Sequence, residues 1–581
     1  MQLVRVKLLS DFRSLKKNFE MKFSQEPIPD SDQLISPICL VGKNGTGKSN
    51  FMELICEIFY YLDSQLLDYP SESLLEKKRF GFELEYKFDL TFNDAFETWK
   101  AASFSWNEAQ RHVKVVKKVT DEEPSYYLID QAGNETNVKR RGGTKRELKQ
   151  KIKLLLPNKV IGYSSGLNEL ISNPFLKMQF HYFHEYQSRL EEDVLDDFDD
   201  GKLFFMNYES NASVVVSNFL LQEPEKLEVL DETVEIAELD SFRIVIELGN
   251  SVEISPDARS TNERADLTDF FKKEIQWLKQ IATTLNEEIL KDVSTGEERV
   301  LLKLDYKVNS STKVGFKHFF GDTNNLYSFF HKMHLLNLFK LPPEKRELVR
   351  NAVSGMNISD LLPKLASDQQ LFRIDRIRLV KSETNKLVEY KSISDGEHQF
   401  MHIVGTSMIM NQHKSLFILD EPETHFNPKW RSKLVSTLNK VEKAEVAIHK
   451  KENQTRISKA FEVILSTHSP FILSDSYRSK VWKFVKEKDE PKADIIQVKT
   501  YGTSFSVLLE EAFDKTVGIS EMSEEYIDEL RKKIESIELA GKNAKKTIEE
   551  LQQKVLALGE SVNKFELYSY LNRLLSEVSK K

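Results

Sequence analysis

A glycine-rich loop near the N-terminus has the composition and spacing of a phosphate-binding loop. Residues 42–49, GKNGTGKS, follow the apolar run at residues 38–41 and open a segment with helical periodicity. The glycines let backbone N–H groups converge on phosphate oxygens, and a helix N-terminus adds free donors and a favourable dipole. We therefore expect Lys48 to bind the β- and γ-phosphates of a nucleotide and Ser49 to ligate Mg²⁺. The rest of the expected cradle is Asn44, Gly45, Gly47 and Asn50.

A second candidate site lies far downstream, where two carboxylates follow an apolar run. Residues 415–422 read SLFILDEP, so a buried strand would deliver Asp420 and Glu421 at its C-terminal end. Asp420 suits coordination of Mg²⁺, and Glu421 could polarise the water that attacks a γ-phosphate. Taken alone, acidic residues after a strand are usually a solvated loop. Downstream of a phosphate-binding loop they predict a Walker B motif, and therefore hydrolysis of ATP.

Two shorter motifs accompany these sites. Residues 394–399, SDGEHQ, begin 26 positions before Asp420, and residues 467–470, THSP, follow the apolar run at residues 463–465. An isolated SDGE is a common turn, and a lone histidine is more often structural, so each motif alone is a weak signal. The order of all four motifs along the chain gives them weight.

In that order the motifs resemble the ABC-type ATPases of the AAA family, including the SMC-like and OLD-like branches. The resemblance implies that Ser394 and Gly396, with Glu397, form a signature motif that holds the γ-phosphate of ATP bound to a second copy of the chain. It also implies that His468 senses that phosphate. ATP, Mg²⁺ and an ATP-dependent homodimer, extending in some assemblies to a higher oligomer, are therefore expected.

Three further stretches fit the family pattern less completely. Residues 423–428, ETHFNP, match the D-loop that crosses the dimer interface, but Asn427 stands where many members carry aspartate, which puts its role in hydrolysis in question. Arg13, in the stretch DFRS, is a candidate phosphate contact, and an ordinary surface arginine is an equal alternative. The stretch VIGYSSG, residues 160–166, falls in the region of the Q-loop but offers no glutamine.

Strands and helices must bring these motifs together. Apolar runs at residues 38–41, 416–419 and 463–465 predict buried strands, and short strands are expected at residues 3–6 and 19–23. Alternation at residues 82–90, with apolar runs at 113–119 and 126–129, predicts an antiparallel β-subdomain. A long helix is expected to carry Leu267, Phe271, Ile275, Leu278, Ile281, Leu285 and Ile289 on one face.

Helical patterns also mark the region before the signature and the C-terminus. A second helix is expected at residues 326–339, ended by Pro342 and Pro343, and the 3-4-3 apolar spacing at residues 527–537 and 548–558 predicts a helical hairpin. The fold class expected is α/β, a P-loop ABC-type ATPase head with a mostly helical insertion and a C-terminal helical hairpin. The expected domains are an ATPase N-lobe (1–165), the insertion (166–370), an ATPase C-lobe (371–515) and the hairpin, a partner-docking segment (516–581).

Composition limits the other possibilities. A chain of 581 residues exceeds the roughly 250–300 residues at which single cores stop growing, so several units are expected. The net charge of −8 argues against a generally basic nucleic-acid coat, and Cys39 and Cys56 are too few for a disulfide framework or a CxxC zinc site. The N-terminus lacks the pattern of a secretory signal and no apolar run is long enough to span a membrane, so we expect a cytoplasmic protein.

The layout separates this chain from several ABC-type relatives. The 345 positions between Ser49 and Ser394 are too many for a transporter cassette and too few for the long arms of SMC or Rad50 proteins. Residues 471–581 hold no glutamate followed by DxD, which the Toprim domain of OLD nucleases would require. The acidic run at residues 196–200 precedes the signature and is interpreted as a solvated surface.

Over most of its length the chain resembles the ATPase subunits of Septu anti-phage systems, the PtuA family, including its retron-associated forms. The likeness lies in SDFRSL, GKNGTGKSN, VIGYSSG, ISDGEHQF, LDEPETHFNP and STHSPFILSD. It implies an antiviral defence role with a PtuB-like HNH nuclease partner and, in retron forms, a reverse transcriptase with its RNA–DNA product (msDNA). The sequence shows no nuclease constellation of its own, in agreement with cleavage by a partner.

Two alternatives to this function stay open, together with one candidate nucleic-acid contact. The chain could be an SMC/Rad50-like DNA-repair ATPase without a toxic partner, or a nearly inactive nucleotide-gated scaffold. A basic run is the best candidate for contact with nucleic-acid phosphates, and a solvated loop leading into a helix is an equal interpretation. The run comprises Lys139, Arg140, Arg141, Lys145, Arg146, Lys149, Lys151 and Lys153.

Overall fold

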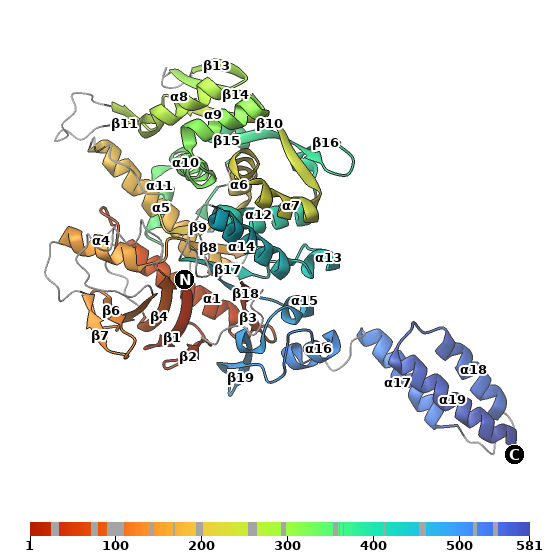
Figure 1. The fold of residues 1–581 in the computed structure, drawn as a ribbon. Coiled ribbons are helices and arrows are strands. Elements are labelled where there is room, and N and C mark those ends of the chain that lie inside the picture. The colour runs from red at the N-terminus through yellow and green to blue at the C-terminus, as the bar shows by residue number, and fades with distance from the viewer. Residues whose placement is uncertain are drawn as a thin grey trace. The chain divides into compact units, whose positions relative to one another are not determined.

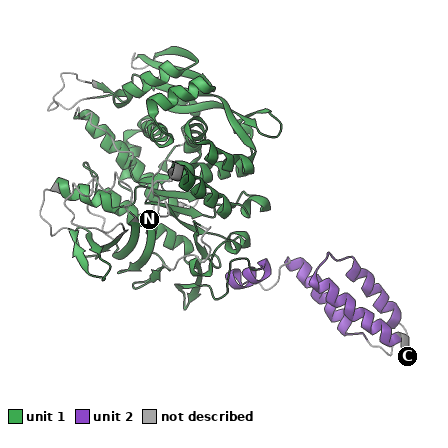
Figure 2. Cartoon of the chain, viewed as in Figure 1, with its two compact units in different colours: residues 1–503 green, residues 504–581 purple. Residues whose placement is uncertain are grey.

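The computed structural model places the chain in two compact units, residues 1–503 and residues 504–581 (Figures 1 and 2). Among the described residues, no helix is both long enough and apolar enough to cross a membrane. The structure describes residues 1–24, 34–70, 80–89, 110–138, 145–166, 169–192, 194, 201–253, 264–291, 298–352, 358, 361–363, 365–410, 414–451, 461–514, 520–537 and 544–580.

A seven-stranded sheet forms the centre of the first unit. Its strand order is β20-β19-β3-β18-β17-β8-β9, and every neighbouring pair is parallel except β19 with β20. All residues of β3, β17 and β18 are buried, which explains why these strands appear in the sequence as continuous apolar runs. The strands are β3 (Ile38–Val41), β8 (Val160–Ser164), β9 (Leu203–Phe205), β17 (Ser415–Asp420), β18 (Phe461–Ser466), β19 (Val481–Glu487) and β20 (Glu490–Ile495).

A second, fully antiparallel sheet contains the N-terminus. Its order is β2-β1-β4-β5-β6-β7, and it confirms the strands predicted from alternation in this part of the sequence. The inward side chains of β4, among them Phe82, Leu84 and Tyr86, are fully buried. The strands are β1 (Gln2–Leu8), β2 (Glu20–Lys22), β4 (Phe82–Asp89), β5 (Gln110–Lys117), β6 (Ser125–Ile129) and β7 (Glu135–Asn137).

Residues 166–370 contain more helix than strand, but they also supply three strands of a sheet that the sequence did not predict. This antiparallel sheet has the order β13-β14-β10-β15-β16, and its last two strands follow residue 370 (Figure 1). The strands are β10 (Ile236–Leu248), β13 (Thr284–Lys291), β14 (Glu298–Lys307), β15 (Phe372–Lys381) and β16 (Leu387–Glu389). A separate two-stranded sheet pairs β11 (Ser251–Glu253) with β12 (Arg264–Asp266).

The long helix expected across residues 267–289 is wrong. Helix α8 (Lys272–Ile281) ends at Ile281, and the chain then enters the edge strand β13, in which every residue is exposed. Leu285 pairs with Leu304 and Ile289 with Val300 across β14. A spacing of four residues places side chains on one face of a helix and also on one face of a strand, so this part of the apolar pattern could not distinguish the two.

The remaining helices of the first unit surround these sheets. Helix α10 and the short turn after it end at Lys340, which confirms the helix predicted before Pro342. The helices are α1 (Lys48–Ser64), α4 (Lys145–Leu155), α5 (Glu169–Glu191), α6 (Tyr208–Leu221), α7 (Pro224–Val234), α9 (Ser310–Phe320), α10 (Thr323–Leu335), α11 (Pro343–Arg350), α12 (Asp395–Ile409), α13 (Pro428–Arg431), α14 (Leu434–Lys451) and α15 (Pro470–Ser474).

The second unit is all helical and begins at Ser504, earlier than the boundary expected at residue 516. It contains α16 (Phe505–Phe513), α17 (Glu521–Glu535), α18 (Ala544–Leu556) and α19 (Val562–Lys580). The predicted hairpin is present as α17 and α18, and α19 adds a third helix whose Leu567, Leu571 and Leu574 complete a shared core. Figure 2 shows these helices in purple.

Candidate active site

Four neighbouring parallel strands bring three of the four motifs, together with the stretch VIGYSSG, to one edge of the central sheet. The phosphate-binding loop follows β3, and the THSP segment follows β18. Asp420 is the last residue of β17 and Glu421 comes next, while the stretch VIGYSSG contains β8 and the two residues after it. These strands are neighbours in the order β3-β18-β17-β8. Because the carboxyl ends of parallel strands meet at the same edge, the motifs lie together although more than 370 positions separate Lys48 from Asp420.

The phosphate-binding loop requires glycine at two crowded turns. Gly42 has φ 129° and Gly47 has φ 106°, in the region that side chains disfavour. A Cβ atom on Gly42 would lie 2.3 Å from the carbonyl oxygen of Phe484, and one on Gly47 would lie 2.9 Å from Cβ of Pro491. At the tip, Asn44 and Gly45 are exposed, so their backbone groups are accessible to a ligand.

Lys48 is a buried cation at the start of α1. Its side chain Nζ donates to the carbonyl oxygens of Gly42 at 2.7 Å and Lys43 at 3.0 Å. Burial lowers the pKa of Lys48, and the nearby carboxylates of Glu421 and Asp420 oppose that shift. A buried ammonium whose hydrogen bonds go to loop carbonyls can turn towards phosphate oxygens without leaving its position, so the residues fit a bound nucleotide.

Asp420 is almost fully buried, and neighbouring hydroxyls orient its carboxylate. Oδ1 accepts a hydrogen bond from Ser466 Oγ at 2.6 Å, and Oδ2 accepts one from Ser164 Oγ at 3.4 Å. Among the described residues, no cluster of three or more His, Cys, Asp or Glu side chains could hold a metal alone. Mg²⁺ is usually held by one or two protein ligands together with substrate phosphates, and Asp420 with Ser49 fits that arrangement.

Glu421 has a left-handed backbone, with φ 47°. Its N–H donates to Ser466 O at 3.2 Å and Ser466 Oγ at 3.1 Å, which holds this conformation in place. His468 Nε2 lies 3.6 Å from Glu421 Oε1, and both side chains are about two-fifths exposed, at 39% and 43%. Strained backbone conformations concentrate at functional sites, and here the strain directs an accessible carboxylate next to an imidazole. Burial lowers the pKa of His468, as does Lys48, so its imidazole is biased towards the neutral form.

The SDGE motif forms the N-terminus of α12. Ser394 caps the helix in a capping box with Glu397, whose Oε2 accepts from Ser394 N at 2.8 Å and from Ser394 Oγ at 2.9 Å. Gly396 allows the segment after Glu421 to approach closely, because a Cβ atom there would lie 2.8 Å from His425 O. Ser394 is exposed, so the motif is accessible to a partner.

A link that the sequence did not predict joins the signature helix to the edge of the sheet. Gln399 Nε2 donates to Tyr163 Oη at 2.6 Å, and its Oε1 accepts from His425 N at 3.3 Å. The stretch VIGYSSG therefore provides Ser164, next to Asp420, and Tyr163 where no glutamine was found. The signal available in the sequence was Gln399 itself, which is the last residue of the SDGEHQ motif and is almost fully buried.

Three residues of uncertain assignment have clear contacts. Arg13, with φ 53°, binds Glu53 of α1 with Nη2 and Oε1 2.8 Å apart, so in this structure it stabilises a buried carboxylate. Asn50 Nδ2 donates to Ser14 Oγ at 2.6 Å, which fixes the N-terminal turn against α1. Asn427 caps α13 by accepting from Trp430 N at 2.9 Å, a role that aspartate also performs well.

The structure describes part of the predicted basic run. Lys139, Arg140 and Arg141 lie outside the described residues. Lys145 and Arg146 open α4, and Arg146 is exposed. Further along that helix Lys149 donates to Leu67 O at 2.7 Å, so this part of the basic run packs against the end of α1.

Comparison with known proteins identifies the type of domain. The protein family described as "AAA domain, putative AbiEii toxin, Type IV TA system" matches residues 251–474, which include the signature, the carboxylate pair and His468. The curated protein ea59 of Escherichia phage lambda is 23% identical over 164 residues, which cover 28% of this chain and only 29% of that relative. Among solved structures, the SMC head domain from Thermotoga maritima aligns with 86% of this chain and 100% of that chain, at 10% identity and a TM-score of 0.29. Residues 251–474 are therefore similar to an AAA-type ATPase domain.

Proposed function

We propose that this chain is the ATP-hydrolysing subunit of a cytoplasmic anti-phage defence complex and that it regulates a partner HNH nuclease. One observation carries the catalytic part of the proposal. Lys48, the Asp420–Glu421 pair and His468 come from three adjacent parallel strands and face one edge of the sheet. This combination of a phosphate-binding cation, an acidic pair and an imidazole suits hydrolysis of a nucleoside triphosphate.

Each of these residues has a separate task in the proposed reaction. Lys48 and the loop N–H groups hold the phosphates, and Glu421 accepts a hydrogen bond from the attacking water and orients it. His468, biased towards the neutral form, can contact the terminal phosphate or the same water. Mg²⁺, when held by Ser49 and Asp420, would neutralise charge on the phosphates.

The position of the signature supports the proposed homodimer. Ser394 is exposed at the N-terminus of the fifteen-residue helix α12, where free backbone donors favour an anion. We propose that this terminus covers the nucleotide bound by the second copy, which would complete the site only when two chains associate. ATP would then control assembly as well as serve as substrate.

The defence role rests on sequence resemblance, and two features of the chain support it. The description of the matching family names a putative AbiEii toxin and a type IV TA system. The C-terminal unit exposes large apolar side chains on α17 and α19, which suit docking of a nuclease subunit. They include Met522 at 84% exposure, Val562 at 74% and Phe565 at 73%. A reverse transcriptase with its msDNA and other nucleic acid are further proposed partners.

Two substitutions test the catalytic proposal in the full chain. Lys48→Ala should abolish ATP binding, and Glu421→Gln should retain binding while turnover falls about 100-fold or more. Lys345→Ala and Glu344→Gln, at exposed positions of α11, are matched controls and should leave both quantities unchanged. Turnover that is unaffected by either active-site substitution would reject the proposed site.

The biological role needs a separate test. The Glu421→Gln chain, affinity-purified from phage-infected cells, should carry a small HNH nuclease, and Phe565→Ser should weaken that association without changing ATP hydrolysis. If the purified chain instead clamps DNA ends in an ATP-dependent manner with no nuclease attached, it is an SMC/Rad50-like repair ATPase and the defence role is wrong.

A further inference from the structure

A cavity of about 470 Å³ lies beside the signature helix and away from the phosphate-binding loop. It is formed by the start of α6, the end of α10, the segment before β15, β15 itself and the residues that follow β16. This volume is within the range of roughly 300–1,000 Å³ that is usual for small-molecule sites. None of its lining residues belongs to the four motifs or to the stretch VIGYSSG.

The cavity wall contains buried polar atoms that have no hydrogen-bond partner. Tyr390, with only 5% of its surface exposed, has a buried hydroxyl without a partner, and Arg373 has a buried Nη1 without one. His334 uses Nε2 to contact Ser213 Oγ at 3.0 Å, while its buried Nδ1 has no partner. Leaving such groups unpaired costs free energy, so a polar ligand that formed hydrogen bonds with them would be stabilised.

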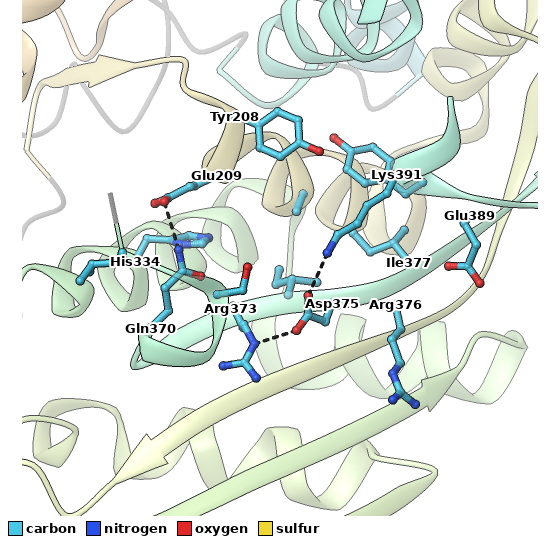
Figure 3. A pocket seen from close by; sticks show the side chains of 15 residues that line it. Tyr208, Glu209, His334, Gln370, Arg373, Asp375, Arg376, Ile377, Glu389 and Lys391 are labelled. Carbon is cyan, nitrogen blue, oxygen red and sulfur yellow. Dashed lines mark hydrogen bonds and ion pairs between the residues drawn. The ribbon is translucent and has the colours of Figure 1, made fainter. Parts of the chain in front are cut away.

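The charges in the cavity favour an anionic group at one side. Asp375 is held by Arg373, with Nε and Oδ2 2.7 Å apart, and by Lys391, with Nζ and Oδ1 3.6 Å apart. Two cations thus face one carboxylate, as Figure 3 shows. Glu389, another lining carboxylate, is already paired with Arg378 at 2.8 Å. The surplus positive charge lies next to the unpaired donor of Arg373 and suits a phosphate.

The cavity also offers an aromatic surface and a hydrogen-bond acceptor. Tyr208 is 66% exposed, which makes its ring available for stacking. Beside it in sequence, Glu209 accepts from Gln370 Nε2 at 3.1 Å through one carboxylate oxygen (Figure 3). A carboxylate next to an exposed ring suits a planar base that presents N–H donors, as guanine does.

From these observations we infer that the cavity is a second ligand site, which binds one nucleotide with its phosphate at Arg373, Lys391 and Tyr390 and its base at Tyr208 and Glu209. The nucleotide is either a free monophosphate or the phosphorylated end of a nucleic-acid strand, because both present the same chemistry. The site does not depend on the proposed defence role.

The position of the site gives it a route to the signature motif. The Tyr390 ring packs edge-on against His398 at 4.4 Å between centroids, and His398 follows Glu397 in α12. Tyr390 also lies only four positions before Ser394. A ligand that binds the Tyr390 hydroxyl would therefore hold Tyr390 in place, and through it the segment that contains Ser394.

Binding to the full chain tests the inference, with GMP, guanosine and a single-stranded DNA hexamer bearing a 5′-phosphorylated dG as probes. GMP lacks the β- and γ-phosphates that Lys48 is expected to contact, so GMP bound at the second site should have the same affinity in the Lys48→Ala chain. GMP should bind with a dissociation constant below about 1 mM, and guanosine should bind about tenfold more weakly. Tighter binding of the hexamer than of GMP would identify a strand end as the ligand, and the reverse would identify a free nucleotide.

Two substitutions and a matched control connect binding to the cavity. Tyr390→Phe removes only the unpartnered hydroxyl, so folding should be intact while GMP affinity falls about tenfold. Lys391→Gln, at an exposed position, should have a similar effect. Tyr126→Phe removes another buried hydroxyl without a partner, from β6 in a different sheet, and should leave binding unchanged. Absence of GMP and hexamer binding, or equal binding by the parent, Tyr390→Phe and Lys391→Gln chains, would overturn the inference.

Discussion

Lys381, the last residue of β15, forms an ion pair with Glu397 at the start of the signature helix. The same Nζ donates to Val234 O at 3.2 Å. Glu397 in turn accepts from both the backbone N–H and the hydroxyl of Ser394. The orientation of the signature serine is thus tied to the antiparallel sheet that contains β15.

We expect Lys381→Met to weaken ATP-dependent dimerisation. Without the ammonium, Glu397 loses a charge-assisted hydrogen bond, and Ser394 is held less firmly in the position proposed to contact the second copy's nucleotide. Such bonds contribute about 1.5–3 kcal/mol, so the dimer dissociation constant should rise about tenfold or more. Sedimentation with saturating ATP in the Glu421→Gln chain measures this change.

The controls for this prediction separate positioning from stability. Lys381→Arg should restore much of the affinity because it keeps the charge, whereas Lys386→Met, at an exposed position of the following turn, should have no effect. A dimer constant that does not change in Lys381→Met would show that this ion pair does not position Ser394.

Glu423 provides a prediction about stability below neutral pH. It is 5% exposed, accepts a hydrogen bond from Thr467 Oγ1 through Oε1, and has a buried Oε2 without a partner. Burial raises the pKa of Glu423 to about 7 from 4.5. The unfolded chain therefore releases this proton at a lower pH than the folded chain, so stability falls as the pH rises from about 4.5 to about 7.

Glu423→Gln should remove that part of the pH dependence. The neutral amide avoids a charge penalty of roughly 3 kcal/mol at pH above 7, so the variant should be the more stable chain at pH 8. Urea unfolding midpoints at several pH values test this, with Glu344→Gln as an exposed control. If the urea midpoints of the parent and Glu423→Gln chains change with pH in the same way, Glu423 is ionised in the folded chain over the whole pH range measured.

The sequence predicted the strands that carry the motifs, but it did not predict the order of these strands in the sheet. Runs such as residues 415–420 are apolar on both faces because parallel strands are buried on both sides, so they stand out without structural information. That β18 lies between β3 and β17 depends on long-range pairing, which no local pattern records. The contact of Ser466 with Asp420, and of His468 with Glu421, could therefore only be found in the fold.

Two other features were hidden for different physical reasons. The exposed edge strand β13 follows α8 after two residues, and its Leu285 and Ile289 continue the helical spacing of the apolar residues before them. The nucleotide cavity combines residues from α6, α10, β15 and the segment after β16, and each of them alone is an ordinary polar or aromatic residue. These residues indicate a binding site only because the fold brings them together around unpaired buried atoms.

Lys414 provides a second prediction about the change of folding stability with pH. This change has the opposite sign to that of Glu423 and occurs at higher pH. Burial lowers the pKa of Lys414 to about 7 from 10.5, and Lys202 lowers it further. Its Nζ donates to Leu154 O at 3.1 Å and lies 4.5 Å from the centre of the Phe88 ring. The folded chain releases this proton before the unfolded chain does, so stability rises as the pH increases from about 7 to about 10.5.

We expect Lys414→Met to flatten the stability profile over that alkaline range. Methionine keeps the apolar contact with Phe88 but carries no proton to release. Urea midpoints between pH 7 and pH 10 should rise in the parent and stay level in the variant, while Lys345→Met, at an exposed position, should behave as the parent. If the urea midpoints of the parent and Lys414→Met chains rise equally with pH, groups other than Lys414 cause the increase in stability.

The C-terminal unit should unfold independently of the ATPase. Its core is made by α17, α18 and α19 alone, and Leu571 of α19 is completely buried within it. Leu571→Ala leaves a cavity that costs about 2–5 kcal/mol, a large share of the stability of so small a unit. Hydrogen exchange followed by mass spectrometry should show faster exchange in residues 544–580, with unchanged protection in the central sheet and unchanged ATP turnover.

Arg573→Ala, two positions further along the same helix and exposed, is the control for this prediction and should leave exchange in both units as in the parent. Loss of protection in β3 and β17 in the Leu571→Ala chain would show that the two units fold cooperatively.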